Sequence, residues 1–197
     1  MITLYTNPQS RGQTVRWMLE EVGAPYEMRE LNYEGAMKTP EYLAINPMGK
    51  VPALVHETPS GTQIVTESAA CCAYLADAFP EAGLAPPPAE RGAYYRWLFF
   101  AAGPIEAAML DRFRKFENDE KMQVMAGYGT WDRAIAALSG AVEGREWIAG
   151  DRFTAADVYA GSAVDWPAKF GMFEPSSALS AYLDRLRARP AYKRVNG

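Results

Sequence analysis

The hydrophobic pattern changes along this chain from short apolar runs to long stretches with helical spacing. Runs rich in apolar and β-branched residues predict four strands, at residues 2–5, 26–31, 51–55 and 63–65. One helix begins near Arg11 or Gly12, and a second covers residues 67–79. A strand, a helix and a strand within the first 31 residues predict a βαβ unit with parallel strands. With one helical turn in the irregular residues 33–45, the expected order is βαβ-α-ββα.

The remainder of the chain has helical spacing throughout. Residues 80–88 are rich in proline, which cannot continue a helix, and they predict a stiff linker. Gly103 and Pro104 are expected to kink or break the first helix that follows. The pattern therefore predicts an α/β N-terminal domain over residues 1–79, a linker over 80–88 and an all-α helical bundle over 89–197.

A capping signal marks the middle of the helical part. Thr154 is followed three residues later by Asp157, which is the spacing of a capping box with Asp in place of the usual Glu or Gln. The helix beyond it is apolar on nearly all sides and is therefore expected to be buried. Water is then excluded from its N-terminus, so we expect Asp157 to have a structural role and no catalytic one.

Composition and charge exclude several classes of function. The 197 residues are 49% hydrophobic and carry a formal net charge of −4, which gives no electrostatic footprint for nucleic acid or an anionic membrane. The chain has no apolar run of membrane-spanning length and no signal-like start, so we expect a cytoplasmic protein. Cys71 and Cys72 are adjacent and form no Cys-x-x-Cys pair, and Cys71 is expected to fill the core. With His56 as the lone histidine, no zinc site is expected.

Two short motifs carry the candidate chemistry. Proline at the mouth of an apolar strand is unusual, and a cis Val51–Pro52 bond at a tight turn accounts for it. Val51 would then present its N–H and C=O to an extended peptide. Glu67 and Ser68 open an Ala-rich helix, whose free N–H groups attract a carboxylate, and Ser68 adds a hydroxyl donor. A peptide edge beside an anion pocket suits a small peptide with a free carboxylate. The simpler alternative is that both motifs only build the fold of the N-terminal domain.

The order Asn46-Pro-x-Gly-Lys50-Val-Pro-Ala-Leu, followed by Glu67-Ser68, resembles the glutathione transferase family. The Thr154-x-x-Asp157 box and the segment 189–192 also resemble that family, so the resemblance covers essentially the whole chain. It implies a thioredoxin-like N-terminal domain and an all-helical C-terminal domain. It also implies that glutathione is the co-substrate, with no metal.

The resemblance assigns roles to individual residues of the two motifs. Val51 would pair through its backbone with the cysteinyl unit of glutathione, and Pro52 would supply the cis bond. Glu67 and Ser68 would hold the γ-glutamyl end. Lys50 could hold the glycyl carboxylate, although an ordinary surface lysine is an equally simple interpretation.

In this family the first strand-to-helix loop activates the thiol. A hydroxyl that donates to the sulfur near a helix N-terminus favours the thiolate, which is the nucleophilic form. Ser10 lies in that loop, and its surroundings resemble serine-type bacterial members, chi-like ones especially, with Arg11 adding positive field. Tyr5, Asn7 and the backbone alone remain alternatives, and Ser10 could instead be an ordinary helix-capping hydroxyl.

These inferences predict a two-domain glutathione transferase, expected to be a homodimer, that conjugates the glutathione thiolate to hydrophobic electrophiles. The electrophile would lie against the kinked helix at residues 94–114. Glutathione-dependent peroxidase or dehalogenase chemistry, which uses the same thiolate, is one alternative. A non-catalytic glutathione-binding or regulatory protein of the same fold is the other.

Overall fold

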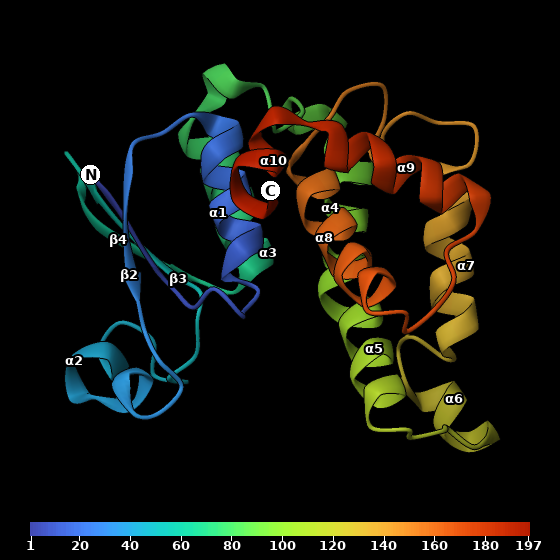
Figure 1. Ribbon diagram of the computed structural model, residues 1–197. Coiled ribbons are helices and arrows are strands. Elements are labelled where there is room, and N and C mark those ends of the chain that lie inside the picture. The colour runs from blue at the N-terminus through green and yellow to red at the C-terminus, as the bar shows by residue number, and fades with distance from the viewer. The chain divides into compact units, whose positions relative to one another are not determined.

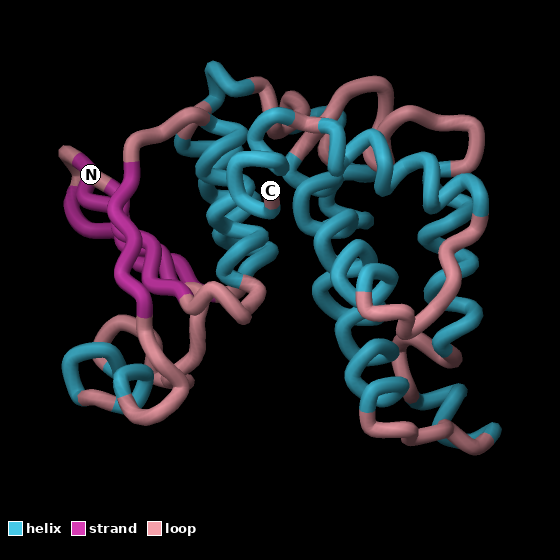
Figure 2. Tube along the Cα trace, in the orientation of Figure 1, coloured by secondary structure: helices cyan, strands magenta, loops and turns pink.

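A computed structural model describes residues 1–197, and the chain groups into two compact units. Unit 1 comprises Met1–Ala85 together with Arg189–Gly197, and unit 2 comprises Pro86–Ala188. Figure 1 labels the elements of both units, and Figure 2 shows that all of the strands lie in the N-terminal part of the chain. None of the helices combines the length and the apolar character that a membrane crossing requires.

Unit 1 is built on a four-stranded mixed sheet with the order β2-β1-β3-β4. The parallel pairing of β1 and β2 confirms the predicted βαβ unit, and β3 runs antiparallel to both β1 and β4. The third strand begins later than residue 51, because Pro52 has no N–H to donate to the ladder. The strands are β1 (Ile2–Thr6), β2 (Tyr26–Glu30), β3 (Ala53–Thr58) and β4 (Gly61–Thr66).

Two helices of unit 1, α1 (Gly12–Val22) and α3 (Ser68–Ala78), pack on each other and cover the same face of the sheet (Figure 1). Gly23 ends α1 in the left-handed conformation, with φ 68°, as a glycine after a helix commonly does. Between β2 and β3 the chain forms two short helical turns, where the sequence predicted one. They are η1 (Ala36–Lys38) and α2 (Pro40–Leu43), and η2 (Pro80–Ala82) follows α3.

The last helix, α10 (Pro190–Asn196), belongs to unit 1, whereas the sequence pattern grouped residues 189–197 with the helical domain. It packs on α1, where Arg189 forms a two-pronged ion pair with Glu21, with N–O distances of 2.6 and 2.7 Å. The ring of Tyr192 meets the Trp17 ring edge-on, with the centroids 5.0 Å apart. These long-range contacts, which no local pattern encodes, hold the end of the chain on α1.

Unit 2 is entirely helical, and α8 lies at its centre. α8 packs against α4 and α9, and nearly all of its first ten residues are buried. The predicted break at Gly103–Pro104 takes the form of a π-helical turn, η4, which joins α4 to α5 and accommodates the proline without ending the helix. The elements are η3 (Pro88–Glu90), α4 (Gly92–Phe100), η4 (Ala101–Ile105), α5 (Glu106–Phe113), α6 (Glu120–Met125), α7 (Trp131–Val142), α8 (Ala155–Lys169) and α9 (Ser177–Ala188).

The capping box at the start of α8 is formed as the spacing predicted. Asp157 has no exposed surface, and its carboxylate accepts hydrogen bonds from the backbone N–H of Ile148 at 2.8 Å and that of Thr154 at 2.9 Å. The Tyr182 hydroxyl donates a third, at 3.0 Å, from α9. Burial raises the pKa of Asp157, and these hydrogen bonds act in the opposite direction. Asp157 therefore joins two helices and a loop inside unit 2.

Candidate functional site

The sheet register brings the three segments singled out in the sequence to the same end of unit 1. Tyr5 on β1 pairs with Ala53 on β3, and Ala53 pairs with Thr66 on β4. The chain leaves β1 at the loop of Ser10, enters β3 from Pro52, and leaves β4 at Glu67, so all three segments adjoin one row of paired residues. Residues distant in sequence thus form one candidate site at this end of the sheet.

The loop between β1 and α1 is held by Ser10. Its hydroxyl donates to the Asn7 carbonyl at 2.7 Å and accepts from the Gly12 N–H at 3.0 Å. A β-carbon at Gly12 would collide with Thr6 Oγ1, so the close approach of the helix start to β1 requires glycine. Ser10 is partly exposed at the N-terminus of α1, where backbone N–H groups favour negative charge. A ligand sulfur could replace the Asn7 carbonyl as the acceptor of the Ser10 hydroxyl.

Asn7 and Tyr5, the two side chains that are alternatives to Ser10 as the thiol-activating group, make contacts within the protein. The Asn7 amide donates to the Leu31 carbonyl at 2.9 Å, and its oxygen accepts from the Gln9 N–H at 2.9 Å. The Tyr5 ring packs against the Tyr42 ring, with the centroids 5.5 Å apart. Asn7 therefore shapes the loop, whereas the half-buried Tyr5 lies against the small core next to β3.

The loop before β3 contains Val51 and Pro52, which are joined by a cis peptide bond. Pro52 is buried and Val51 packs on the core cluster of Met37, Tyr42 and Ala53, while Lys50 is exposed. The carbonyl of Lys50 accepts two hydrogen bonds, from the Tyr42 hydroxyl at 2.6 Å and from the Asn46 side-chain amide at 2.8 Å. The backbone of this loop is thus fixed from the protein side.

The start of α3 combines backbone strain with a helix N-terminus. Glu67 has φ 65° and ψ 120°, a conformation that costs a non-glycine residue of the order of 1–3 kcal/mol and that clusters at binding and catalytic sites. Glu67 is exposed and Ser68 is 8% exposed. The first N–H groups of a helix have no partner within it, so this corner offers donors to an anion.

Three further side chains hold the loop before β3, and the sequence predicted no role for them: those of Lys38, Tyr42 and Asn46. The Lys38 ammonium donates to the carbonyls of Met48 at 3.2 Å and Gly49 at 3.0 Å. For Asn46 the sequence did contain a signal, the Asn46-Pro47 pair, because an asparagine at the start of a turn often accepts a hydrogen bond from the backbone N–H two residues on. Asn46 does so, accepting from Met48 N at 3.1 Å. Lys38 and Tyr42 carried no comparable signal.

Neither cysteine takes part in the site. Cys71 and Cys72 have no exposed surface and are unpaired, and burial raises the pKa of Cys71 to about 12. The prediction that Cys71 fills the core is confirmed. His56 packs on Phe79 and is hydrogen bonded through Nδ1 to the Tyr74 hydroxyl at 2.9 Å. No group of three or more histidine, cysteine or acidic side chains is arranged to hold a metal ion.

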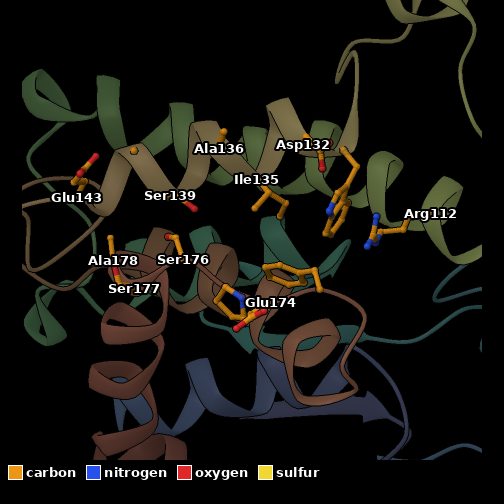
Figure 3. A pocket seen from close by; sticks show the side chains of 14 residues that line it. Arg112, Asp132, Ile135, Ala136, Ser139, Glu143, Glu174, Ser176, Ser177 and Ala178 are labelled. Carbon is orange, nitrogen blue, oxygen red and sulfur yellow. The ribbon is translucent and has the colours of Figure 1, made fainter.

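Unit 2 contains a separate open cavity of about 760 Å³, between α7 and the segment that joins α8 to α9 (Figure 3). Asp132 and Glu143 lie near opposite ends of α7 along its rim, as Figure 3 shows. The Trp131 ring forms part of the wall and contacts the Arg112 guanidinium, 5.0 Å from its centroid. None of the residues predicted to bind glutathione lines this cavity.

Comparisons with known proteins identify the same two parts of the chain. The family models described as "Glutathione S-transferase, N-terminal domain" and "Glutathione S-transferase, C-terminal domain" match residues 10–78 and 95–190. The chain is 30% identical to Glutathione S-transferase GstA of Escherichia coli O157:H7, over 76% of this chain and 74% of that protein. It is 27% identical to the Escherichia coli K12 disulfide-bond oxidoreductase YfcG, over 97% of this chain and 92% of that protein.

A solved structure is similar over nearly the full length. It is a glutathione transferase family member from Pseudomonas fluorescens with two glutathione molecules bound. The identity is 30% and the TM-score 0.80, with 98% of this chain and 91% of that chain covered. The similarity therefore extends to the sheet and helices that form the candidate site.

Proposed function

Because this chain belongs to the glutathione S-transferase family, we propose that it conjugates the thiolate of glutathione to hydrophobic electrophiles. The sulfur would attack an electrophilic carbon and form an S–C bond. The displaced electron pair would leave with a leaving group or, in an addition, move to a neighbouring atom that is then protonated. We place the chain with the serine-type, chi-like members on the resemblance of the segment around Ser10. From the family resemblance of the whole chain we expect a homodimer, and from the absence of a membrane-spanning run and of a signal-like start we expect a cytoplasmic location.

The observation that carries the proposal is the convergence of three backbone segments at one end of the sheet of unit 1. Val51 would bind the cysteinyl backbone beside Pro52, and Lys50 would reach the glycyl carboxylate. Glu67 and Ser68, at the start of α3, would bind the γ-glutamyl end. These are the donors and acceptors that a tripeptide with free carboxylates requires.

In this proposal Ser10 stabilises the thiolate. Its hydroxyl, which donates to the Asn7 carbonyl at 2.7 Å, would turn to the ligand sulfur. A hydrogen bond to the charged form lowers the thiol pKa from the usual value of about 8.5 and raises the thiolate fraction at neutral pH. The exposed Arg11 would add positive field at the same helix start.

Disulfide reduction is a second candidate function, favoured by the similarity to the oxidoreductase YfcG and by the two glutathione molecules bound in the Pseudomonas structure. One glutathione thiolate would attack a disulfide sulfur, displace the other sulfur as a thiolate and leave a mixed disulfide. A second glutathione thiolate would then attack the glutathione sulfur of that mixed disulfide, which releases the second substrate thiolate and forms oxidised glutathione. The peroxidase and dehalogenase alternatives use the same thiolate. The non-catalytic alternative predicts that glutathione binds with an unshifted thiol pKa.

The test is an ultraviolet titration of the bound glutathione thiolate in the wild type and in Ser10→Ala. We expect a pKa below the free value in the wild type. In Ser10→Ala we expect a pKa about one unit higher and a turnover near neutral pH about tenfold lower, with glutathione affinity nearly unchanged. Ser60→Ala, which changes an exposed serine in the β3–β4 turn, is the matched control. A low pKa in both proteins would move the activating role to Tyr5, Asn7, Arg11 or the backbone.

A second variant tests the γ-glutamyl end separately. Ser68→Ala should weaken glutathione binding and leave the pKa of the bound thiol unchanged, since Ser68 lies at the start of α3 and Ser10 at the start of α1. Calorimetric titration with glutathione measures the affinity. Unchanged glutathione affinity in Ser68→Ala would refute the proposed carboxylate pocket. Turnover of the wild type with a panel of electrophiles would separate conjugation from disulfide reduction.

A further inference from the structure

The carbonyl of Lys50 is held by two buried side chains from the preceding segment. The Tyr42 hydroxyl donates to it at 2.6 Å and the Asn46 amide at 2.8 Å, and each of these residues is 3% exposed. A carbonyl oxygen has two lone pairs, so both acceptor sites are occupied. The exposed side chain of Lys50 belongs to the surface, whereas its backbone is anchored in the protein.

This anchoring determines the direction of the next N–H group. The carbonyl of Lys50 and the N–H of Val51 belong to the same peptide unit, which is planar. The unit is trans, since the cis bond is the following one, Val51–Pro52. In a trans peptide the C=O and N–H point in opposite directions, so the donors that hold the Lys50 oxygen also aim the Val51 N–H away from them.

We infer that Tyr42 and Asn46 are positioning residues for glutathione, because together they fix the backbone N–H of Val51 in its binding direction before the ligand arrives. The inference rests on the proposed function, in which Val51 pairs with the cysteinyl backbone. Two donors on one carbonyl also polarise the peptide unit, which strengthens the N–H on its other side as a donor. Neither residue touches the ligand in this scheme.

Each of the two donors is itself oriented by the local fold. Asn46 accepts from Met48 N–H at 3.1 Å through its side-chain oxygen, which leaves the amide nitrogen for Lys50. The Tyr42 ring lies against the Tyr5 ring, and the backbone N–H of Tyr42 donates to the side-chain oxygen of Thr39, the N-cap residue, at 3.3 Å. Burial raises the pKa of Tyr42 to about 12, so its hydroxyl keeps its proton near neutral pH. The two donors are thus in place in the ligand-free protein.

The test compares the Tyr42→Phe and Asn46→Ala variants and their double variant by calorimetric titration with glutathione. Either single change leaves one donor on the Lys50 oxygen, so we expect about threefold weaker binding from each. The double variant leaves that acceptor without either donor, and we expect about thirtyfold weaker binding, well above the product of the single effects. The thiol pKa of bound glutathione and the turnover at saturating glutathione should stay at the wild-type values.

Tyr74→Phe is the matched control, because it removes one tyrosine hydroxyl, bonded to His56 Nδ1, elsewhere in unit 1. If Tyr42 and Asn46 had only a structural role, their variants would lose no more glutathione affinity than Tyr74→Phe does for the same loss of melting temperature. That result, or a double variant with wild-type affinity, overturns the inference while leaving the proposed function intact. Absence of glutathione binding in the wild type would instead refute the proposed function, and the inference with it.

Discussion

Replacing Asp157 with asparagine is the sharpest test of how unit 2 is held together. Each carboxylate oxygen accepts two hydrogen bonds. Oδ1 accepts from Ile148 N–H and the Tyr182 hydroxyl, and Oδ2 accepts from Thr154 N–H and the Thr154 hydroxyl. Asparagine keeps one oxygen and places an NH₂ group, which can only donate, where the other was. In either orientation the NH₂ group faces one backbone N–H, which can only donate, and one hydroxyl, which must turn away from its donating position.

The magnitude follows from the groups that lose their acceptor. One buried backbone N–H is orphaned in either orientation, and such a group costs about 1–3 kcal/mol. The hydroxyl beside it loses its acceptor as well, at a net cost of about 1 kcal/mol. We therefore expect Asp157→Asn to lower the free energy of unfolding of unit 2 by about 2–4 kcal/mol. Water cannot replace the lost acceptor and so cannot reduce this cost, since Asp157 has no exposed surface.

The assay is urea unfolding of the full chain followed by far-ultraviolet circular dichroism, which reports the helices of both units, most of whose residues lie in unit 2. Asp132→Asn is the control, because Asp132 is exposed in the first turn of α7 and its change should cost less than about 1 kcal/mol. Equal stabilities of the two variants would refute the reasoning. A loss in Asp157→Asn that left the Ile148 and Thr154 amides protected from hydrogen exchange would refute it as well.

Three further outcomes test other contacts. Arg189→Ala should destabilise unit 1 by about 2 kcal/mol, because it leaves the Glu21 carboxylate, whose side chain is 7% exposed, without its two-pronged partner; thermal unfolding measures this. Gly12→Ala should destabilise unit 1 by about 1–3 kcal/mol, since its β-carbon would collide with Thr6 Oγ1; denaturant unfolding measures it. Both thiols should resist alkylation near pH 7 in the native protein, as burial raises the pKa of Cys71 to about 12; mass spectrometry after iodoacetamide treatment counts the modified sites.

Each of these outcomes has a control and a contradicting result. Lys193→Ala, a change on the exposed face of α10, controls for Arg189→Ala, and equal melting temperatures for the two variants would show that the ion pair contributes little. Gly127→Ala, where a β-carbon meets nothing within 4 Å, controls for Gly12→Ala. Full alkylation after denaturation controls for the thiols, and rapid labelling of the native protein would contradict their burial.

The local pattern of the sequence determined most of the secondary structure. Apolar runs and turn residues predicted β1, β2 and β4, and the Thr154–Asp157 spacing predicted the capping box, since both depend on residues within a few positions of one another. The Asn46–Leu54 motif and the Glu67–Ser68 pair also pointed to the candidate site. The start of β3 was misplaced by two residues, because Pro52 cannot join the ladder.

What only the tertiary structure decided depends on pairs of residues far apart in the chain. The register of Tyr5, Ala53 and Thr66 brings the three site segments to one end of the sheet. The ion pair between Arg189 and Glu21 assigns the last helix to unit 1. A sequence pattern records which side of an element is apolar, but the partner of a polar group is set by the packing of distant elements, because buried donors and acceptors must find one another in space.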